Sequence, residues 1–358
     1  MIRRSLIHIL LLGHVAEAFS EFFTPSLPYV TVLHASPLKY SALPQGISPF
    51  EKSIAKGMDI QENFRKLAAP AVERAIRDGV TQIELDFPCF VGGDQSKTQF
   101  DDLDNLQELD ANRDWCVQLL PTISNKKRDV WFILPDDKEC ELAAKEWTGQ
   151  RFRQAAKFTS IRAAIMATAG EDQYSKAWGS SIASVVSKLS GGDGILADSS
   201  TLDELTDDDE DDSDSKTRLH LVCQPGSGGP VEDWINVERI HKASPPGQLT
   251  CVVNGALDKV RDGYYAAVFF PALASTVPFY KQFEAVFVLR PLSAKGLYGW
   301  LFRVYPEPWQ VVLQMARPTK KGDQTVVTVE NMVALVSQDR PSYQESVDAM
   351  LATAAKKQ

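Results

Sequence analysis

The spacing of hydrophobic and polar residues predicts alternating helices and strands over the middle of the chain. Residues 58–79 carry apolar side chains at helical intervals and end in Gly79, a favourable C-cap, so a helix is expected there. Residues 129–135 are apolar on both faces, which is typical of a strand in a covered sheet. Further helices are expected over residues 111–127, 138–147 and 231–242, a loop over 91–110, and further strands over 81–87, 158–165, 218–225 and 249–255.

The final third has a different pattern, in which β-rich runs follow one another with short loops between them. The runs 283–291, 299–306 and 308–315 predict an antiparallel meander, and a helix is expected over residues 342–356. Strands joined through a helix should instead lie parallel. The sequence therefore predicts a single mixed α/β domain, with a largely parallel three-layer α/β/α core that an antiparallel β-meander extends.

Residues 170–216 interrupt this order with a strongly acidic segment. Nine of the twelve residues from 203 to 214 are Asp or Glu, and their repulsion opposes regular structure, so a disordered insertion is predicted. A calcium-binding loop is the alternative, but the fixed Gly and the final Glu of an EF-hand are missing.

The first 56 residues have the composition of a targeting sequence. Residues 1–18 combine Arg3 and Arg4 with an apolar run of about ten residues and a small-x-small cleavage site, which is the layout of a signal peptide. Residues 19–56 are rich in Ser, Thr and Pro, and with Phe19 after the cleavage site they resemble the transit segments of algal plastids. Ordinary secretion, the alternative, predicts paired cysteines and N-glycosylation sequons, and the chain has no sequon. A soluble plastid protein is expected, because the apolar run is too short to span a bilayer.

Composition limits the classes of partner and cofactor. The formal net charge is −9, and it becomes −11 without residues 1–56, which contain five bases and three acids. Such a chain has no overall attraction for nucleic acid and suits a basic partner surface. Five widely spaced cysteines without a CxxC pair argue against a disulfide framework and a zinc site, so we predict no metal and no other cofactor.

Signatures of catalysis are missing from the sequence. No GxSxG, HExxH or GxxxxGK[ST] string occurs, and His220 and His241 are the only histidines that follow the predicted targeting segment. We therefore predict no catalytic residue, and His220 is expected to be structural because it alternates within a strand.

One loop has the position of an anion site. Gly228 and Gly229 follow a predicted strand and precede a helix, where backbone N–H groups favour an anion, and Asn254 ends the neighbouring strand at the same edge. These three residues are the candidates for binding a nucleotide or phosphometabolite. The alternative is a flexible turn, since Val231 replaces the third glycine of the dinucleotide fingerprint.

The meander contains arginines and aromatic residues in apolar runs. Strand alternation is expected to place Arg303 and Tyr305 on one face, and a buried arginine needs a partner such as an acid or an aromatic ring. Either the cluster satisfies itself and fixes the strand register, or it recognises a partner, because Arg, Tyr and Trp anchor binding surfaces. Arg290, Arg303, Tyr305 and Trp309 are the predicted partner or ligand contacts.

Several strings occur in the order seen in one known family. With GVTQIELDFP, VWFILPDD, LVCQP, LRPL and LFRVYPEPWQVVL, the chain resembles the DUF1995 family of cyanobacteria, algae and plants over most of residues 58–316. After Asn254 the family usually continues with Pro and Arg, where this chain has Gly255 and Ala256, and this difference weakens an anion site there. The resemblance implies a role in accumulating or assembling photosystems.

These observations lead to two functional hypotheses for a domain over residues 57–316, followed by an extension over 317–358. The first is a non-catalytic plastid auxiliary factor that supports biogenesis or assembly of the photosynthetic apparatus. Its protein partners would be photosystem subunits or assembly intermediates, and peripheral thylakoid association is compatible with it. The alternative is a nucleotide- or phosphometabolite-binding enzyme or regulator that uses the carboxyl edge of the parallel sheet.

Overall fold

The computed structural model of the chain describes residues 40–44, 47, 60–89, 105–124, 128–174, 217–226, 231–321 and 324–357. The predicted signal peptide and residues 175–216 of the predicted disordered insertion lie outside these residues. The first residues of that insertion lie inside them, and Glu171–Gln173 form a 3-10 turn. Residues 40–44 and 47 of the predicted transit segment lie inside them, and several contact the body of the protein. Ile47 is buried in the main core, and the Ser41 backbone N–H and hydroxyl donate to the Glu307 carboxylate at 2.7 and 2.9 Å.

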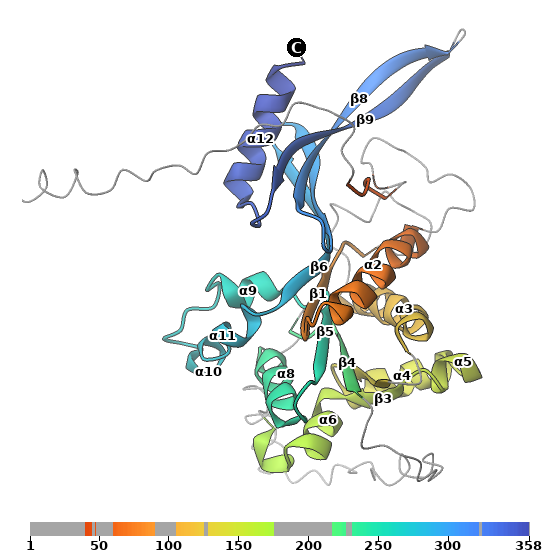
Figure 1. The fold of residues 1–358 in the computed structure, drawn as a ribbon, viewed down its shortest axis with the longest axis vertical. Coiled ribbons are helices and arrows are strands. Elements are labelled where there is room, and N and C mark those ends of the chain that lie inside the picture. Colours follow the sequence, from red (N-terminus) through yellow and green to blue (C-terminus); the bar gives the residue numbers. More distant parts are fainter. Residues whose placement is uncertain are drawn as a thin grey trace, which may run out of the picture. The chain divides into compact units, whose positions relative to one another are not determined.

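The described strands form one sheet in the order β3-β2-β4-β5-β1-β6-β7-β8-β9 (Figure 1). Their bounds are β1 Gln82–Asp86, β2 Arg128–Leu134, β3 Lys157–Ser160, β4 Thr217–Cys223, β5 Leu249–Val253, β6 Glu284–Ala294, β7 Leu297–Val304, β8 Trp309–Lys321 and β9 Gln324–Ser337. Every pair from β3 to β6 is parallel, and every pair from β6 to β9 is antiparallel. The predicted mixed α/β architecture is confirmed.

Helices cover both faces of the parallel strands, because successive residues of a strand point to opposite sides. On β2, Phe132 packs into the same core as α2 and α3, whereas Trp131 packs with α6 and α8. The helices are α2 Ile60–Arg77, α3 Asn105–Ile123, α4 Asp137–Glu146, α5 Gln150–Arg153, α6 Ile161–Thr168, α8 Glu232–Ala243, α9 Leu257–Arg261, α10 Pro271–Ala274, α11 Val277–Tyr280 and α12 Tyr343–Ala355, with a 3-10 turn η2 at Glu171–Gln173.

The meander has its own helix and core. Val347 and Met350 of α12 pack on Val311 and Leu313 of β8. Asp86 of β1 and Val288 of β6 are register partners, so they point to the same side of the sheet. The face that carries α8 and α9 therefore continues into the face that carries α12, with β6 as the junction.

Three predictions about the bounds and number of helices and strands are wrong. The strand predicted over 158–165 ends at Ser160, whose hydroxyl accepts from the Ala163 N–H at 3.0 Å and thereby caps α6. The helix predicted over 111–127 begins earlier, at Asn105, inside the predicted loop, and it contains Pro121. The meander has a fourth strand, β9, in addition to the three that were predicted.

Candidate functional site

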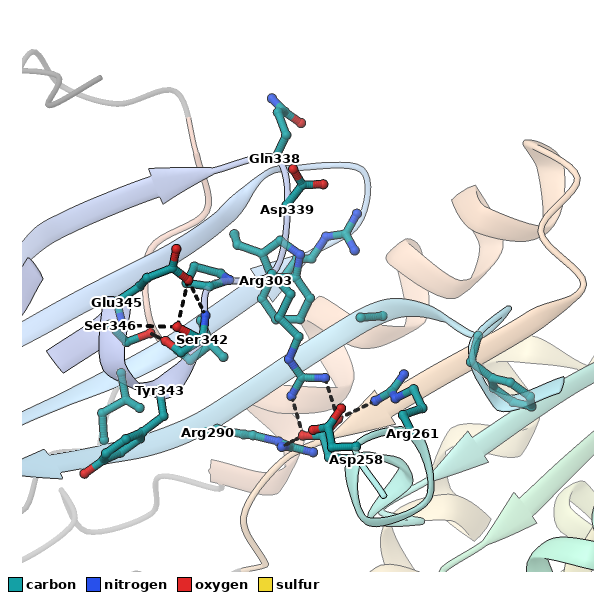
Figure 2. Close-up of a pocket in the computed structure, with 18 of the residues that line it drawn as sticks. Asp258, Arg261, Arg290, Arg303, Gln338, Asp339, Ser342, Tyr343, Glu345 and Ser346 are labelled. Carbon is teal, nitrogen blue, oxygen red and sulfur yellow. Dashed lines mark hydrogen bonds and ion pairs between the residues drawn. The ribbon is translucent and has the colours of Figure 1, made fainter. Parts of the chain in front are cut away.

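A pocket of about 1030 Å³ lies between α9 and α12, over strands β6, β7 and β8 (Figure 2). Its wall combines arginines from four segments with carboxylates from α9, β6 and the turn before α12. The lining residues used below are Asp258, Arg261, Asp262, Lys281, Glu284, Arg290, Arg303, Trp309, Asp339 and Arg340. The pocket is near the carboxyl ends of β1 and β5, the edge at which open α/β sheets usually bind ligands.

Asp258 of α9 is the centre of what we call the arginine cluster, formed by Asp258, Arg261, Arg290 and Arg340. Arg340 donates to both carboxylate oxygens of Asp258 at 2.7 Å each, and Arg261 donates to Oδ1 at 2.6 Å. Arg290 donates to Oδ2. Two carboxylate oxygens accept about four hydrogen bonds, so the acceptor capacity of Asp258 is filled.

Two acids of β1 complete the pairing of this cluster. Arg290 also binds Asp86, and Arg261 binds Glu84 at 2.8 Å. Burial raises the pKa of Asp258, but the attraction of Arg290, Arg340 and Arg261 outweighs it and holds that pKa below its usual range. Burial raises the pKa of Glu84, although Arg261 opposes the shift. Asp258 therefore stays ionised, whereas burial disfavours the ionised form of Glu84.

Trp309 is 3% exposed, and two arginines contact its ring. The guanidinium carbons of Arg303 and Arg340 lie 5.2 Å from its ring centroid, within cation–π range. Arg303 also pairs with Glu284 at 2.6 Å and donates to the Glu307 carbonyl at 3.2 Å. Trp309 thus joins the meander to the arginine cluster through Arg340.

The rim of the pocket carries charges that are not paired in this way. Asp262, Lys281 and Asp339 are exposed, and none of them makes a side-chain hydrogen bond or ion pair with another residue in the described ranges. A molecule that enters the pocket would therefore contact the two unpaired carboxylates and the unpaired ammonium group of the rim before it contacted the ion-paired arginines.

The structure brings together three of the four predicted contact residues. Arg290, Arg303 and Trp309 line this one pocket, but Tyr305 does not. The predicted alternation of Arg303 and Tyr305 on one face is wrong because β7 ends at Val304. Tyr305 lies in the following turn, and its hydroxyl donates to Asp78 Oδ2 at 3.2 Å.

Sequence reasoning found Trp309, the aromatic partner of Arg303, but it missed the three residues that join Arg290 in the arginine cluster. Asp258, Arg261 and Arg340 carry no recognisable motif. A usable signal was the position of the first two, which follow directly after a predicted parallel strand and so belong to the edge where ligands bind. The position of Arg340 opposite Trp309 depends on β9, which was not predicted.

The comparison with protein families identifies this architecture. A family model described as "Domain of unknown function (DUF1995)" matches residues 60–346. The chain belongs to the DUF1995 family. Neither the curated proteins nor the solved structures gave a match.

The other predicted site of the DUF1995 domain lies at the ends of β1, β4 and β5. Asn254 is 7% exposed, accepts from the Phe87 N–H at 2.8 Å and donates to Asn112 Oδ1 at 2.6 Å. Asn112 in turn donates to Gln224 at 2.7 Å and accepts from the Cys89 thiol at 2.8 Å. We call Cys89, Asn112, Gln224 and Asn254 the amide network.

The amide network uses the side chain of Asn254 within the protein. Gly228 and Gly229, the other two anion-site candidates, lie outside the described residues. Burial raises the pKa of the Cys89 thiol well above its ordinary value, which makes it a poor nucleophile. No observation of this edge therefore supports binding of a nucleotide or phosphometabolite by Asn254.

Cys116, Cys223, Cys251 and His220 of the DUF1995 domain are buried, and Cys140 is partly buried. All five cysteines are free, and Cys223 and Cys251 are buried on neighbouring strands. His220 is 1% exposed, neither ring nitrogen has a partner, and burial lowers its pKa to about 3. Within the described ranges, no group of three or more His, Cys, Asp and Glu could hold a metal, and no helix is long and apolar enough to cross a membrane.

Proposed function

We propose that this DUF1995 protein is a non-catalytic plastid auxiliary factor that supports biogenesis or assembly of the photosynthetic apparatus by binding a protein segment in the pocket between α9 and α12. The observation that carries the proposal is the arginine cluster, whose side chains are already fixed by ion pairs (Figure 2). The composition of residues 1–56 supports the plastid setting, and the resemblance described above supports the photosynthetic one.

The chemistry of the pocket suits holding a partner more than transferring protons. Arginine stays protonated in proteins, and an anion with its lone pairs filled by guanidinium groups, such as Asp258, is a weak base. A pocket whose side chains are fixed in advance loses less conformational entropy when a partner binds. These properties favour recognition by a rigid surface.

The open groups on the rim define the kind of segment that fits. Asp262 and Asp339 offer two carboxylates, so a segment that carries basic side chains satisfies them, and such a partner agrees with the chain's net charge of −9. Rim charges act mainly on the rate and specificity of association. The partner would therefore be a basic segment of a photosystem subunit or of an assembly intermediate.

A charge reversal on the rim tests this proposal. Trp309 and Arg303 are too buried to be informative, since replacing them would disturb the fold. We expect Asp262→Lys with Asp339→Lys to reduce the fraction that co-migrates with thylakoid complexes on native gels at least tenfold, after expression of the full chain in plastid-containing cells. The matched control is Glu141→Lys with Asp172→Lys, which reverses two exposed acids elsewhere and should leave co-migration unchanged.

Three results would contradict the proposal. The rim variant could co-migrate as well as the unchanged chain, which excludes the pocket as the contact. The chain could be absent from the plastid fraction, which excludes the setting. A nucleotide or sugar phosphate could raise the melting temperature in a way that Asn254→Ala abolishes, which would favour the alternative at the carboxyl edge.

A further inference from the structure

An uncharged stretch follows α9 and forms the segment that leads to β6. Residues 263–280 contain no Asp, Glu, Lys, Arg or His. At 18 residues the stretch approaches the length of a membrane span, but it folds as a loop followed by the four-residue helices α10 and α11. Its apolar side chains therefore have to be accommodated without a transmembrane helix.

Half of these side chains anchor the segment in the core. Tyr280 is buried and donates to the Trp234 carbonyl at 2.6 Å, and the ring centroid of Tyr265 lies 5.6 Å from Trp234 and 5.3 Å from Phe270. The loop also has internal bonds, since the Phe269 and Phe270 N–H groups both donate to the Ala266 carbonyl. The loop is thus held in one conformation by contacts on the side that faces the core.

The other half points to solvent. Tyr264, Val268 and Phe269 are 74, 79 and 77% exposed, whereas the next most exposed large apolar side chain among the described residues, Tyr343, reaches 60%. Ala266 and Ala267, between them in sequence, are exposed as well. Single exposed apolar residues are common, but a contiguous set that a rigid loop displays marks an interaction site.

We propose that the loop 263–270 inserts Tyr264, Val268 and Phe269 into the interfacial region of a lipid bilayer. A side chain that is about three-quarters exposed extends from the surface, and a fluid bilayer accepts it without a matching cavity. Tyr and other amphipathic aromatic residues are enriched where hydrocarbon meets head groups. Lys259 and Lys281, both exposed, flank the stretch and supply cations at head-group level, with Asp262 as the opposing acid.

Insertion of this kind depends on apolar contact more than on charge. The chain is acidic overall, so attraction to anionic lipid cannot be the driving force. Binding should therefore occur on uncharged vesicles and resist salt. The proposal does not rest on the function proposed for the pocket, although Asp262 and Lys281 border both regions.

Site-specific labelling tests insertion in the full chain. We expect an environment-sensitive fluorophore on Val268→Cys to shift its emission to shorter wavelength on vesicles of phosphatidylcholine, and to be quenched by nitroxide-labelled lipid. The matched control is Met166→Cys, which replaces an apolar residue that is 48% exposed on α6 and should show neither change. Because the five native cysteines are buried or partly buried, the unchanged chain measures background labelling.

A second variant separates lipid contact from other causes. Tyr264→Ser with Phe269→Ser, at exposed positions, should keep the melting temperature and reduce the emission shift of the label at least tenfold. The proposal is overturned if the Val268→Cys label gives no shift on phosphatidylcholine. It is also overturned if the shift requires phosphatidylglycerol and disappears in 0.5 M salt, or if it appears only on membranes that contain other proteins.

Discussion

The amide network and the arginine cluster lie at the same end of the parallel strands but differ in charge and exposure. The four residues of the amide network are neutral and at most 7% exposed. The side chains of the arginine cluster are ionised and 14–28% exposed. A neutral hydrogen-bonded set closes the sheet edge at low desolvation cost, whereas ion pairs near solvent keep their charge and remain accessible. One edge of the sheet thus contains a buried part, the amide network, and a solvent-accessible part, the arginine cluster.

The amide network and the arginine cluster also differ in the helices and strands that they connect. The amide network connects the ends of neighbouring strands with α3. Asp258 instead connects α9, β6 and the turn before α12, and so ties the parallel core to the meander. The arginine cluster should therefore matter most for the mutual placement of these two regions.

The largest effect is expected when Asp258 is removed. Asp258→Ala leaves Arg261, Arg290 and Arg340 without their shared acceptor, and we expect the free energy of unfolding to fall by about 3 kcal/mol, as for a partly buried ion pair that loses one member. Urea denaturation at low salt measures it. Asp262→Ala, one turn further along, should change stability by less than about 0.5 kcal/mol. Equal losses for the two variants would show that the cluster has no special role.

A smaller loss is expected in the amide network. Asn112→Ala removes the partner of Cys89, Gln224 and Asn254 and leaves buried polar groups unsatisfied, which costs about 2 kcal/mol. Because these groups are neutral, the loss should be the same in low and high salt, unlike that of Asp258→Ala. The exposed Asn331, which accepts one hydrogen bond from Gln314, provides the control as Asn331→Ala. A salt-dependent loss for Asn112→Ala would remove the distinction between the two sets.

The smallest effect concerns pH, and it involves two buried groups without a counter-ion in the described residues. Burial lowers the pKa of His220 to about 3 and raises the pKa of Asp233 to about 7. Below pH 6.5 the unfolded chain protonates His220 and the folded chain does not, so acid destabilises the fold. Asp233 acts oppositely, because between pH 7 and 4 the folded chain binds the proton. The two contributions nearly cancel.

Removing one of these groups should reveal the pH dependence that the other gives to the stability. We expect Asp233→Asn to lose about 2 kcal/mol of stability between pH 7 and pH 5, which leaves the His220 contribution uncompensated. His220→Gln should instead gain stability over the same interval. Urea midpoints at the two pH values measure both changes. Identical pH profiles for the two variants would contradict the assignment.

Much of the parallel half could be predicted from sequence, because its strands are apolar runs and its helices have apolar faces. The strand predicted over 158–165 failed because a helix cap at Ser160 outweighed a β-rich composition. Arg290, Arg303 and Trp309 were found because charged and aromatic residues stand out in apolar strands. Trp309 was also found as an aromatic partner of Arg303. The other members of the arginine cluster were not found, because the sheet order brings Asp258 to Arg290. Arg340 reaches Trp309 through β9, whose Val- and Thr-rich run was not predicted as a strand.

The contacts of Ser41 and Ile47 with the folded body bear on the predicted cleavage of the transit segment. A protease that trimmed the chain as far as residue 56 would remove a buried isoleucine and leave the Glu307 carboxylate without two donors. If the predicted transit segment is cleaved, a cut that leaves this body intact would have to fall upstream of Ser41, and residues 41–47 would remain as a structural element.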